Sequence, residues 1–325
     1  MSQLVPAASA SASASAPPDY RRRAQLAGWG RRLVILLSSL VLLAYALAPV
    51  AWLVSSSFQT EKEIISVPPH WIPNEPTARN FRAIFSAGDE KVTYENRAKV
   101  DPSSGGYIPP TARNLLPAMW NSFLVATIVV ILNLLLGTPA AYAMSKIRYW
   151  GRTGSIYFIL LTRVVPDIAL VVPFFFVIRK LGLLDSIGAL VVTYLALTLP
   201  FTVFILLQYF DGLPDELDKA ARVDGCSRVQ VLTKVFLPLA MPALVAVILF
   251  AFLTSWNEFL FALMFTQTVK SQTLPILVAA FTSDFTISFS FINAAGVLAI
   301  VPPIIVAIVF ERYIVSGLTA GAVKG

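Results

Sequence analysis

The stretch DGLPDELDKAARVDGCSRVQVLTKVFLPLAMP, residues 211–242, is a long polar segment between two strongly apolar runs. Its turn and capping residues predict two short helices that meet at a glycine. Pro214 can occupy the start of a helix, where the missing amide hydrogen is not needed. Gly225 can adopt the positive φ that commonly closes a helix. Ser227 and Gln230 match a capping box, which indicates that a second helix begins there.

Composition places the chain in the membrane class. Hydrophobic residues make up 57% of its 325 residues and charged residues only 13%, whereas about a quarter of a soluble domain is charged. The net charge of +7 is better explained by basic residues flanking apolar spans than by a nucleic-acid partner. With one cysteine, Cys226, and one histidine, His70, we expect no disulfide framework and no zinc site. No metal or cofactor is expected on this chain.

The apolar runs predict an all-α integral membrane protein with six transmembrane helices. Residues 1–30 read as a disordered tail that is rich in Ala and Ser. Residues 56–118 read as an outer aqueous loop with a short amphipathic helix around residues 77–85. Each run is long enough to cross about 30 Å of hydrocarbon as a helix. The predicted spans are approximately residues 32–55, 119–144, 154–178, 187–208, 240–265 and 292–310.

Positive charges in the short connections predict the orientation. One set of connections carries most of the basic residues, and such connections face the cytoplasm. The other face carries only Arg179, Lys180 and Lys270 in its short loops. Both termini and the polar segment at residues 209–239 are therefore expected in the cytoplasm. The cytoplasmic basic residues would be Lys146, Arg148, Arg152, Lys219, Arg222, Arg228 and Lys234.

The 209–239 segment permits several interpretations. A DNA-binding helix–turn–helix is disfavoured, because acidic residues balance its basic ones and apolar spans adjoin both ends. An inert loop remains an alternative. Leu217, Ala220 and Ala221 form a small, flat stripe that suits the groove of another protein. Asp224 lies at a helix C-terminus, where the dipole disfavours a carboxylate, so a partner's arginine could compensate it or it could cap the second helix.

Several motifs carry a resemblance to a known family. K-A-A-R-V-D-G at residues 219–225, followed by L-P-L at residues 237–239, resembles the EAA loop of ABC importer permeases. W-N-E-F-L at residues 256–260 and the ending from Ile314 are similar to the maltose-type carbohydrate permeases, in particular their MalG-like subunit. The resemblance covers about residues 30–325. Lys219 departs from it, since the family usually has glutamate there.

The resemblance implies a type I ABC importer permease fold over residues 31–325 and a location in the bacterial inner membrane. The partners implied are ABC ATPase subunits, which would hold ATP and Mg, a MalF-like second permease subunit and an extracytoplasmic solute-binding protein. The chain itself contains no G-x-x-x-x-G-K-[ST] phosphate loop, so it is not expected to be an ATPase. The residues expected to couple to the ATPase are Leu217, Lys219, Ala220, Ala221, Asp224 and Gly225.

Polar residues within the predicted spans are candidates for the substrate pathway. Arg163 and Asp167 have i,i+4 spacing and can pair on one helix face in the third span. A neutralised pair that fixes a kinked helix, or a location near water at the end of the span, is the alternative to a pathway role. Glu258 could accept a hydrogen bond from a sugar hydroxyl while a neighbouring aromatic ring stacks on the sugar, and helix–helix packing is the alternative. The pathway candidates are Arg163, Asp167, Asn133, Trp256, Asn257, Glu258 and Phe259.

The function expected is therefore ATP-driven import of a carbohydrate by alternating access. A permease for another small solute, such as glycerol phosphate, is an alternative. An ion-coupled secondary transporter is disfavoured because no clear internal repeat is present. An intramembrane enzyme is disfavoured because H-E-x-x-H and G-x-S-x-G are absent and only one histidine is available.

Overall fold

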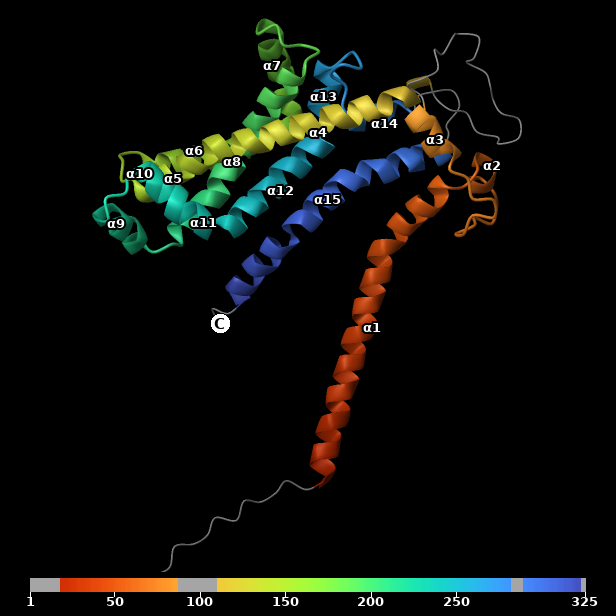
Figure 1. The fold of residues 1–325 in the computed structure, drawn as a ribbon, viewed down its shortest axis with the longest axis horizontal. Helices are drawn as coiled ribbons and strands as arrows, with labels where there is room; N and C mark the ends of the chain where they lie inside the picture. Colours follow the sequence, from red (N-terminus) through yellow and green to blue (C-terminus); the bar gives the residue numbers. More distant parts are fainter. Residues whose placement is uncertain (1–17, 87–109, 282–288, 323–325) are drawn as a thin grey trace, which may run out of the picture. The chain divides into compact units, whose positions relative to one another are not determined.

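The structure, a computed structural model, describes residues 18–86, 110–281 and 289–322 (Figure 1). The chain divides into two compact units, Met1–Trp52 and Leu53–Gly325. Residues 1–17 of the expected tail and residues 87–109 of the expected outer loop lie outside the described residues. The first unit contains most of one long helix, α1 (Pro18–Ser57).

The second unit is all-helical in class, with helices joined by loops and no strand among its described residues. The elements before the 209–239 segment are α2 (Glu61–Ile64), α3 (Arg79–Ser86), η2 (Pro110–Asn114), α4 (Leu115–Leu132), the π-helical turn η3 (Asn133–Gly137), α5 (Thr138–Lys146), α6 (Arg152–Thr162), α7 (Asp167–Lys180) and α8 (Ile187–Asp211). Those that follow are α9 (Asp215–Val223), α10 (Arg228–Val231), the π-helical turn η4 (Leu232–Phe236), α11 (Leu237–Leu239), α12 (Met241–Asn257), α13 (Leu260–Phe265), α14 (Leu274–Ala280) and α15 (Phe289–Ala322).

The described helices include four that are long and apolar enough to cross a membrane. They are Trp29–Ser57, Thr111–Lys146, Ile187–Asp211 and Phe289–Tyr313. Two sharply bent pairs pass the same test together: Arg152–Thr162 with Asp167–Lys180, bent by 97°, and Arg228–Leu239 with Met241–Asn257, bent by 83°. Counting each pair as one span gives up to six. The predicted all-α membrane fold is confirmed.

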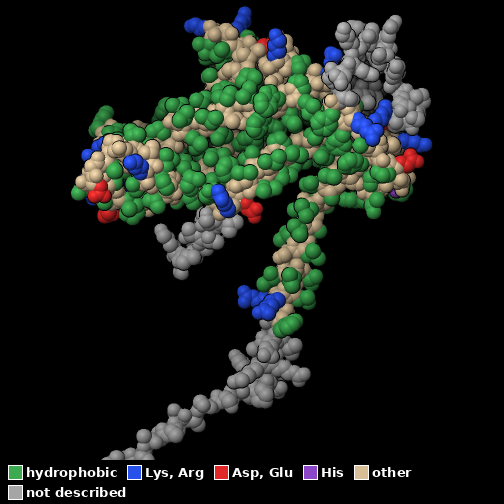
Figure 2. Space-filling view, in the orientation of Figure 1, with side chains coloured by type: hydrophobic (Ala, Val, Ile, Leu, Met, Phe, Trp, Pro, Cys, Tyr) green, Lys and Arg blue, Asp and Glu red, His purple; other side chains and the backbone are tan. Residues whose placement is uncertain are grey.

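Within the second unit, α4, α8, α12 and α15 run alongside one another (Figure 1). Helix α12 packs against the other three, and α4, η3 and α5 together run along α8. Apolar side chains cover much of the visible surface of these helices, as expected where lipid rather than water surrounds them (Figure 2). Charged side chains gather at the end that carries α9 and α10 and again at the end that carries α2 and α3.

A core of aromatic rings lies where α5, α8 and η4 meet. Tyr142, Phe210 and Phe236 are buried there. The ring centroids of Tyr142 and Phe236 are 5.2 Å apart, and those of Phe210 and Phe236 are 5.8 Å apart, both in edge-on geometry. Such pairs contribute more than their buried area alone. This core gives the polar segment beside it a rigid base.

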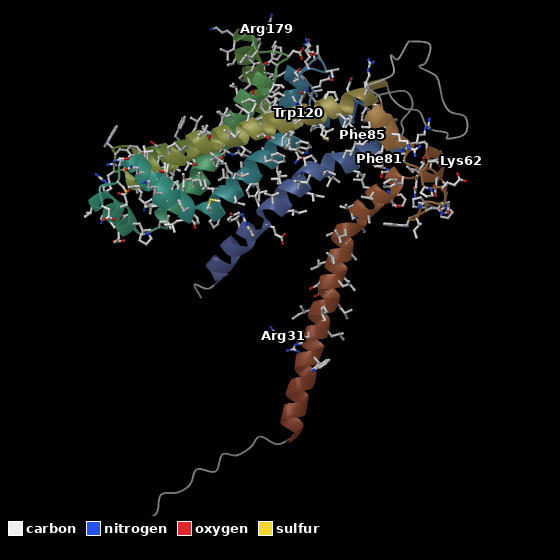
Figure 3. The ribbon with its side chains drawn as sticks, in the orientation of Figure 1. Arg31, Lys62, Phe81, Phe85, Trp120 and Arg179 are labelled. Carbon is white, nitrogen blue, oxygen red and sulfur yellow. The ribbon has the colours of Figure 1, made fainter. Side chains whose placement is uncertain are left out.

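The short helix expected around residues 77–85 is confirmed as α3. Its Phe81 ring packs against Phe58, with centroids 5.1 Å apart. Phe81 and Phe85 both project from this helix (Figure 3), and Phe85 remains largely exposed. One turn of α3 therefore contributes to the fold while leaving an aromatic ring on its outer side.

The third predicted span is interrupted. Helix α6 ends at Thr162 and α7 begins at Asp167, so the expectation that Arg163 and Asp167 share one helix face is wrong. Pro166 occupies the N-cap of α7 with extended backbone (φ −62°, ψ 135°), and it has no amide hydrogen to continue α6. The residue before a proline is also driven out of the helical region. The i,i+4 spacing implies a shared face only in a continuous helix, which this proline prevents.

Candidate functional site

The 209–239 segment folds into the two predicted helices, α9 and α10. Gly225 closes α9 with φ +86°, and the Cys226 amide donates to the Ala221 carbonyl at 3.0 Å. At the start of α10, the Gln230 amide donates to Ser227 Oγ while the Ser227 amide donates to Gln230 Oε1, which completes the capping box. The predicted glycine turn and capping box are therefore both confirmed.

Two side chains of α5 fasten one face of α9. The Tyr142 hydroxyl donates to Asp218 Oδ1 at 2.6 Å. Lys146 Nζ donates to Asp215 Oδ1 at 2.8 Å and to the Leu213 carbonyl at 2.9 Å. The hydrogen bond and charge of Lys146 lower the pKa of the Asp215 carboxyl. Sequence reasoning missed this attachment, because it used Lys146 only to decide orientation.

Burial explains why Lys146 is held so firmly. Only 4% of its side chain is exposed, and its ammonium lies 5.6 Å from the centroid of the Phe236 ring. A buried ammonium is costly unless it is paired and hydrogen-bonded. The Asp215 carboxylate, the Leu213 carbonyl and the Phe236 ring meet that requirement together. Lys146 therefore links α5 to the beginning of α9.

The loop between α5 and α6 is tied to the end of α8. Arg152 Nη2 donates to Asp211 Oδ2 at 2.7 Å, and Arg152 Nε donates to the Met144 carbonyl at 2.6 Å. Ser145 Oγ donates to Asp211 Oδ1 at 2.7 Å. These bonds hold the α5–α6 loop beside the start of the polar segment. They add a second attachment next to that of Lys146.

The outward face of α9 differs from the expected contact stripe. Ala221 is buried in the core beneath α9 and Leu217 is half-buried, so the expectation that Leu217, Ala220 and Ala221 all face a partner is wrong. Positions four apart share a helix face, and positions 217 and 221 face the bundle. The exposed stripe instead contains Glu216, Lys219, Ala220 and Val223, the last with 87% of its surface exposed. Asp224 and Gly225 are also exposed, directly after the helix.

Asn133 is buried inside the helix bundle. It is fully buried at the start of η3, where its Nδ2 donates to the Val129 carbonyl at 2.9 Å and to Thr198 Oγ1 at 2.8 Å. Its Oδ1 accepts from Thr202 Oγ1 at 2.8 Å. A Cβ on Gly137 in the same turn would come within 2.6 Å of the Thr202 side chain. The prediction of Asn133 as a pathway residue is therefore wrong, because its amide joins η3 to α8.

A further interruption of the membrane helices lies between α12, which ends at Asn257, and α13, which begins at Leu260. Glu258 caps α13 there: Oε1 accepts from the Phe261 amide at 2.9 Å and Oε2 from the Ala262 amide at 3.1 Å. Trp256 is only 2% exposed and stacks on Phe252, with ring centroids 5.8 Å apart. The expectation that Glu258 and Trp256 are poised for a sugar is thus not supported by their contacts, which are with the protein itself.

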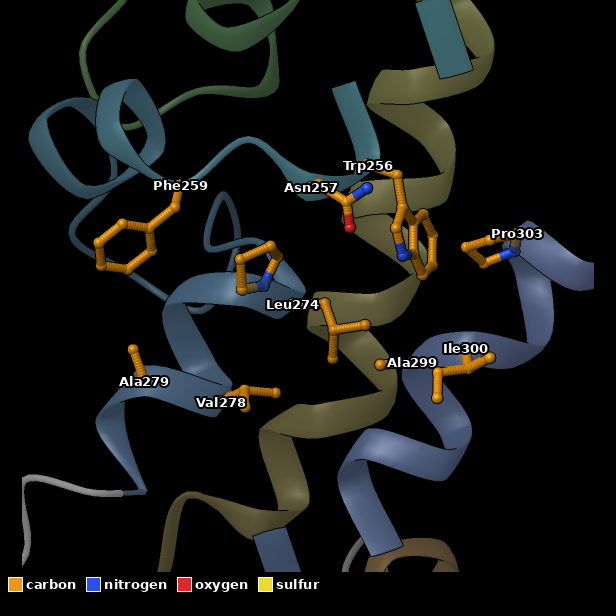
Figure 4. A pocket seen from close by; sticks show the side chains of 10 residues that line it. Trp256, Asn257, Phe259, Leu274, Val278, Ala279, Ala299, Ile300 and Pro303 are labelled. Carbon is orange, nitrogen blue, oxygen red and sulfur yellow. The ribbon is translucent and has the colours of Figure 1, made fainter. Parts of the chain in front are cut away.

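A cavity of about 700 Å³ lies beside this break, between α12, α14 and α15 (Figure 4). Its lining is mainly apolar and includes Phe259, Val278 and Ile300, together with the edge of Trp256. Asn257 also borders it, but Asn257 Nδ2 donates to the Leu253 carbonyl at 2.9 Å. The cavity therefore suits an apolar occupant better than a hydroxyl-rich one.

A smaller hollow of about 280 Å³ lies at the α6–α7 break. It brings Arg163, Asp167 and the Phe174 side chain together with Ala196, Leu197 and Pro200 of α8. Arg163 Nη1 donates to the Leu197 carbonyl at 2.8 Å. In the part of the chain that the structure describes, Arg163 and Asp167 form no ion pair with each other. The hollow is therefore bordered by a guanidinium and a carboxylate that do not neutralise each other by direct contact.

The loops at the other end of α7 and α8 are locked by Asp185, which sequence reasoning also missed. Its backbone takes a positive φ of 56°, and its carboxylate accepts from the Gln267 amide at 2.8 Å and the Thr268 amide at 2.9 Å. The Ser271 hydroxyl donates to the same carboxylate. The Ser271, Gln267 and Thr268 hydrogen bonds hold the pKa of Asp185 well below its usual range. Within the described residues, no group of three or more His, Cys, Asp or Glu could hold a metal ion.

Comparisons with known proteins identify a family that this chain matches. Residues 133–319 match the family described as binding-protein-dependent transport system inner membrane component. The chain is 34% identical to the trehalose/maltose transport system permease protein MalG of Thermococcus litoralis, over 91% of this chain and 98% of that protein. It is 33% identical to the sulfoquinovosyl glycerol transport system permease protein SmoH of Agrobacterium fabrum, over 88% of this chain and 91% of that protein.

A solved structure supports the fold independently. The crystal structure of a bacterial ABC transporter involved in the import of the acidic polysaccharide alginate contains a chain that matches with a TM-score of 0.67. The match covers 88% of this chain and 96% of that one, at 23% identity. At this identity the likeness concerns the fold alone.

Proposed function

The chain belongs to the family of inner membrane components of binding-protein-dependent transport systems, and we propose that it is the permease subunit of an ATP-driven carbohydrate importer. The observation that carries the proposal is its similarity, over nearly the whole chain, to proteins named as permeases for trehalose or maltose and for sulfoquinovosyl glycerol. The bundle of apolar helices with one compact polar element fits a membrane subunit that a separate motor drives.

The proposed location is the bacterial cytoplasmic membrane, with both termini and the 209–239 segment in the cytoplasm. Basic residues of the short connections support this orientation. Lys146 and Arg152 lie at the α5–α6 loop, and both contact the polar segment. Most of the basic residues and the α9–α10 element would then lie on one side of the membrane.

The motor proposed is a pair of ABC ATPase subunits, which hydrolyse ATP outside this chain. The absence of a phosphate-loop motif from the sequence supports a separate ATPase. The exposed stripe of α9, with Lys219, Ala220 and Val223, is the surface proposed to enter a cleft of the ATPase. The opposite face of α9 is fastened to α5 by Tyr142 and Lys146, so movement of α9 would displace α5.

A second permease subunit and an extracytoplasmic solute-binding protein complete the proposed assembly. Two permease chains would enclose the path, and the binding protein would deliver carbohydrate from outside. ATP binding and hydrolysis would shift the population between outward-open and inward-open states, because the ATPase and the binding protein each bind one state better. Substrate would then move by alternating access.

The proposal is tested by reconstituting the four kinds of subunit in sealed vesicles and measuring uptake of labelled sugars. ATP supplied on the ATPase side should drive uptake, and an uncoupler should leave it unchanged. Uptake that continues without ATP and collapses with an uncoupler would instead identify an ion-coupled transporter. Competition by excess glycerol phosphate, but not by neutral sugars, would point to the alternative small-solute permease.

A further inference from the structure

We propose that the hollow at the α6–α7 break is a binding subsite for one ring of the transported carbohydrate, an inference that rests on the proposed function. Arg163 and Asp167 would supply its polar contacts and Phe174 an apolar wall. All three border the same hollow of about 280 Å³, which lies between α8 and the break where the chain bends by 97°.

Charged side chains within a membrane-spanning segment cost free energy unless polar groups surround them. Residues 152–180 form one of the apolar segments that would cross the membrane as a bent pair. Charged side chains in such a segment face the bundle interior or a water-filled cavity, because exposure to lipid costs several kcal/mol. The break separates Arg163 from Asp167, so mutual pairing does not offset that cost. Water or a polar ligand in the hollow would do so.

Arg163 is held in place without using up its donors. A guanidinium has five N–H donors, and one of them is used on the Leu197 carbonyl at 2.8 Å. Pro200 lies one turn further along α8 and, having no amide hydrogen, leaves the carbonyl of residue 196 without its helical donor. Arg163 thus binds α8 where its backbone hydrogen bonding is interrupted. This contact fixes the guanidinium while its other donors remain available to a ligand.

The two side chains together define the chemistry of the ligand. Arg163 can only donate hydrogen bonds, and an ionised Asp167 can only accept them. A sugar hydroxyl does both, so neighbouring hydroxyls on one ring can satisfy both side chains. Asp167 would repel a phosphate or carboxylate ligand, whereas Arg163 would repel a simple cation. The pair therefore favours a neutral polyhydroxyl compound, and the Phe174 ring can pack against its C–H face.

The size of the hollow and the apolar lining of the larger cavity both support a sugar-ring subsite at the α6–α7 break. Pockets for small ligands measure roughly 300–1,000 Å³, so a hollow of about 280 Å³ fits a single sugar ring, with further rings of an oligosaccharide outside it. The cavity beside the α12–α13 break is larger, about 700 Å³, but its one side-chain amide, Asn257, already donates to the Leu253 carbonyl. It offers few contacts to hydroxyl groups.

The test uses the complete transporter in vesicles, with uptake of a neutral sugar measured per ATP hydrolysed. Asp167→Asn keeps the size of the side chain but lets it donate, and Arg163→Gln removes the charge. Each should lower uptake roughly tenfold, the loss expected for a hydrogen bond to a charged group. Asn257→Ala is the matched control at the rival cavity, and uptake should stay near that of the parent protein.

A second readout separates binding from a structural effect. If Asp167 accepts a hydrogen bond from the sugar, removing the matching hydroxyl from the substrate should cost the parent protein much of its uptake and cost Asp167→Asn little more. A damaged fold would reduce uptake of the sugar and all its singly deoxygenated analogues equally, which would overturn the proposal. Thermal unfolding of each purified complex identifies such damage.

The outcomes distinguish the subsite from the proposed function. If the parent protein shows no ATP-driven carbohydrate uptake, the proposed function fails. If the parent is active and both variants transport as well as the parent, the subsite proposal alone fails. Loss of uptake in Asn257→Ala, with normal uptake in Asp167→Asn, would place the carbohydrate in the other cavity and also overturn the proposal.

Discussion

At the scale of single residues, the backbone conformation at Gly225 restricts which residue types this position can accept. Its φ of +86° is unfavourable for a side chain with a Cβ, although no atom lies within 4 Å of where that Cβ would be. The constraint is therefore one of backbone conformation and not of space. A β-branched residue at this position costs about 1–3 kcal/mol.

We predict that Gly225→Val will reduce the ATP-driven uptake of the assembled transporter, because the turn that orients α9 and α10 will shift. Gly225→Asn is the matched control, since asparagine tolerates the left-handed region better than other residues. Uptake and ATP hydrolysis in reconstituted vesicles measure both. Normal coupled turnover in Gly225→Val would refute the importance of this turn.

Glu258 shows how a residue expected in the pathway has a different role. Its two carboxylate oxygens accept from the amides of Phe261 and Ala262 at the start of α13. We predict that Glu258→Ala will destabilise the protein by about 1 kcal/mol, as expected for the loss of a helix cap. Glu258→Gln keeps one acceptor oxygen and should lose less. Melting temperatures of both variants equal to that of the parent protein would contradict this role.

Asp185 supplies a prediction about pH. Hydrogen bonds from Ser271, Gln267 and Thr268 hold its pKa below the value in the unfolded chain, so its ionised form stabilises the fold. That contribution is complete at neutral pH and falls only as pH drops below about 4, the ordinary Asp range. Asp185→Asn should therefore lower the melting temperature at pH 7, and the difference from the parent should shrink in strong acid. A constant difference across this range would contradict the assignment.

At the scale of elements, α5 and α9 behave as a connected pair. Tyr142 and Lys146 of α5 bind Asp218 and Asp215 on the inward face of α9, and Ala221 packs beneath it. Helix α5 continues from η3, where Asn133 bonds to Thr198 and Thr202 of α8. Movement of α9 would therefore reach the membrane helices through side chains that are already in contact.

We predict that Lys146→Met will uncouple ATP hydrolysis from transport, because methionine keeps an apolar stem but loses the bonds to Asp215 and Leu213. Arg148→Met is the matched control, as Arg148 is an exposed cation two residues further on. Uptake per ATP hydrolysed should fall in the first variant and not in the second. Equal ratios in all three proteins would show that the α5–α9 attachment transmits nothing.

The elements also show what sequence reasoning can and cannot predict. The turn at Gly225 and the capping box at Ser227 follow from local rules, and both are predicted correctly. The breaks at residues 163–166 and 258–259 do not follow from the apolar runs, because an apolar run has the same composition whether its helix is straight or bent. The face of α9 is also assigned wrongly, since a small residue such as Ala221 suits a partner's groove and its own core equally well.

At the scale of the whole molecule, the chain is a membrane subunit whose polar 209–239 segment and helix breaks belong to one bundle of apolar helices. Sequence patterns predict this class, because repeated apolar runs long enough to cross a bilayer are typical of membrane proteins. Contacts between distant residues are beyond such patterns: Asn121 Nδ2 donates to the carbonyls of Val269 and Gln272, 148 and 151 residues away. Such pairs leave no local pattern in the sequence.

The proposed coupling requires that a partner ATPase bind the outward face of α9, and protection from a thiol reagent tests that binding most directly. Two single-cysteine variants are made in a Cys226→Ser background. Val223→Cys places a thiol at a position where the native side chain is 87% exposed. Lys270→Cys places a thiol in the α13–α14 loop, which we assign to the other side of the membrane. We predict that adding the ATPase will slow maleimide labelling at position 223 and leave labelling at position 270 unchanged. Equal labelling at position 223 with and without the ATPase would contradict the proposed docking.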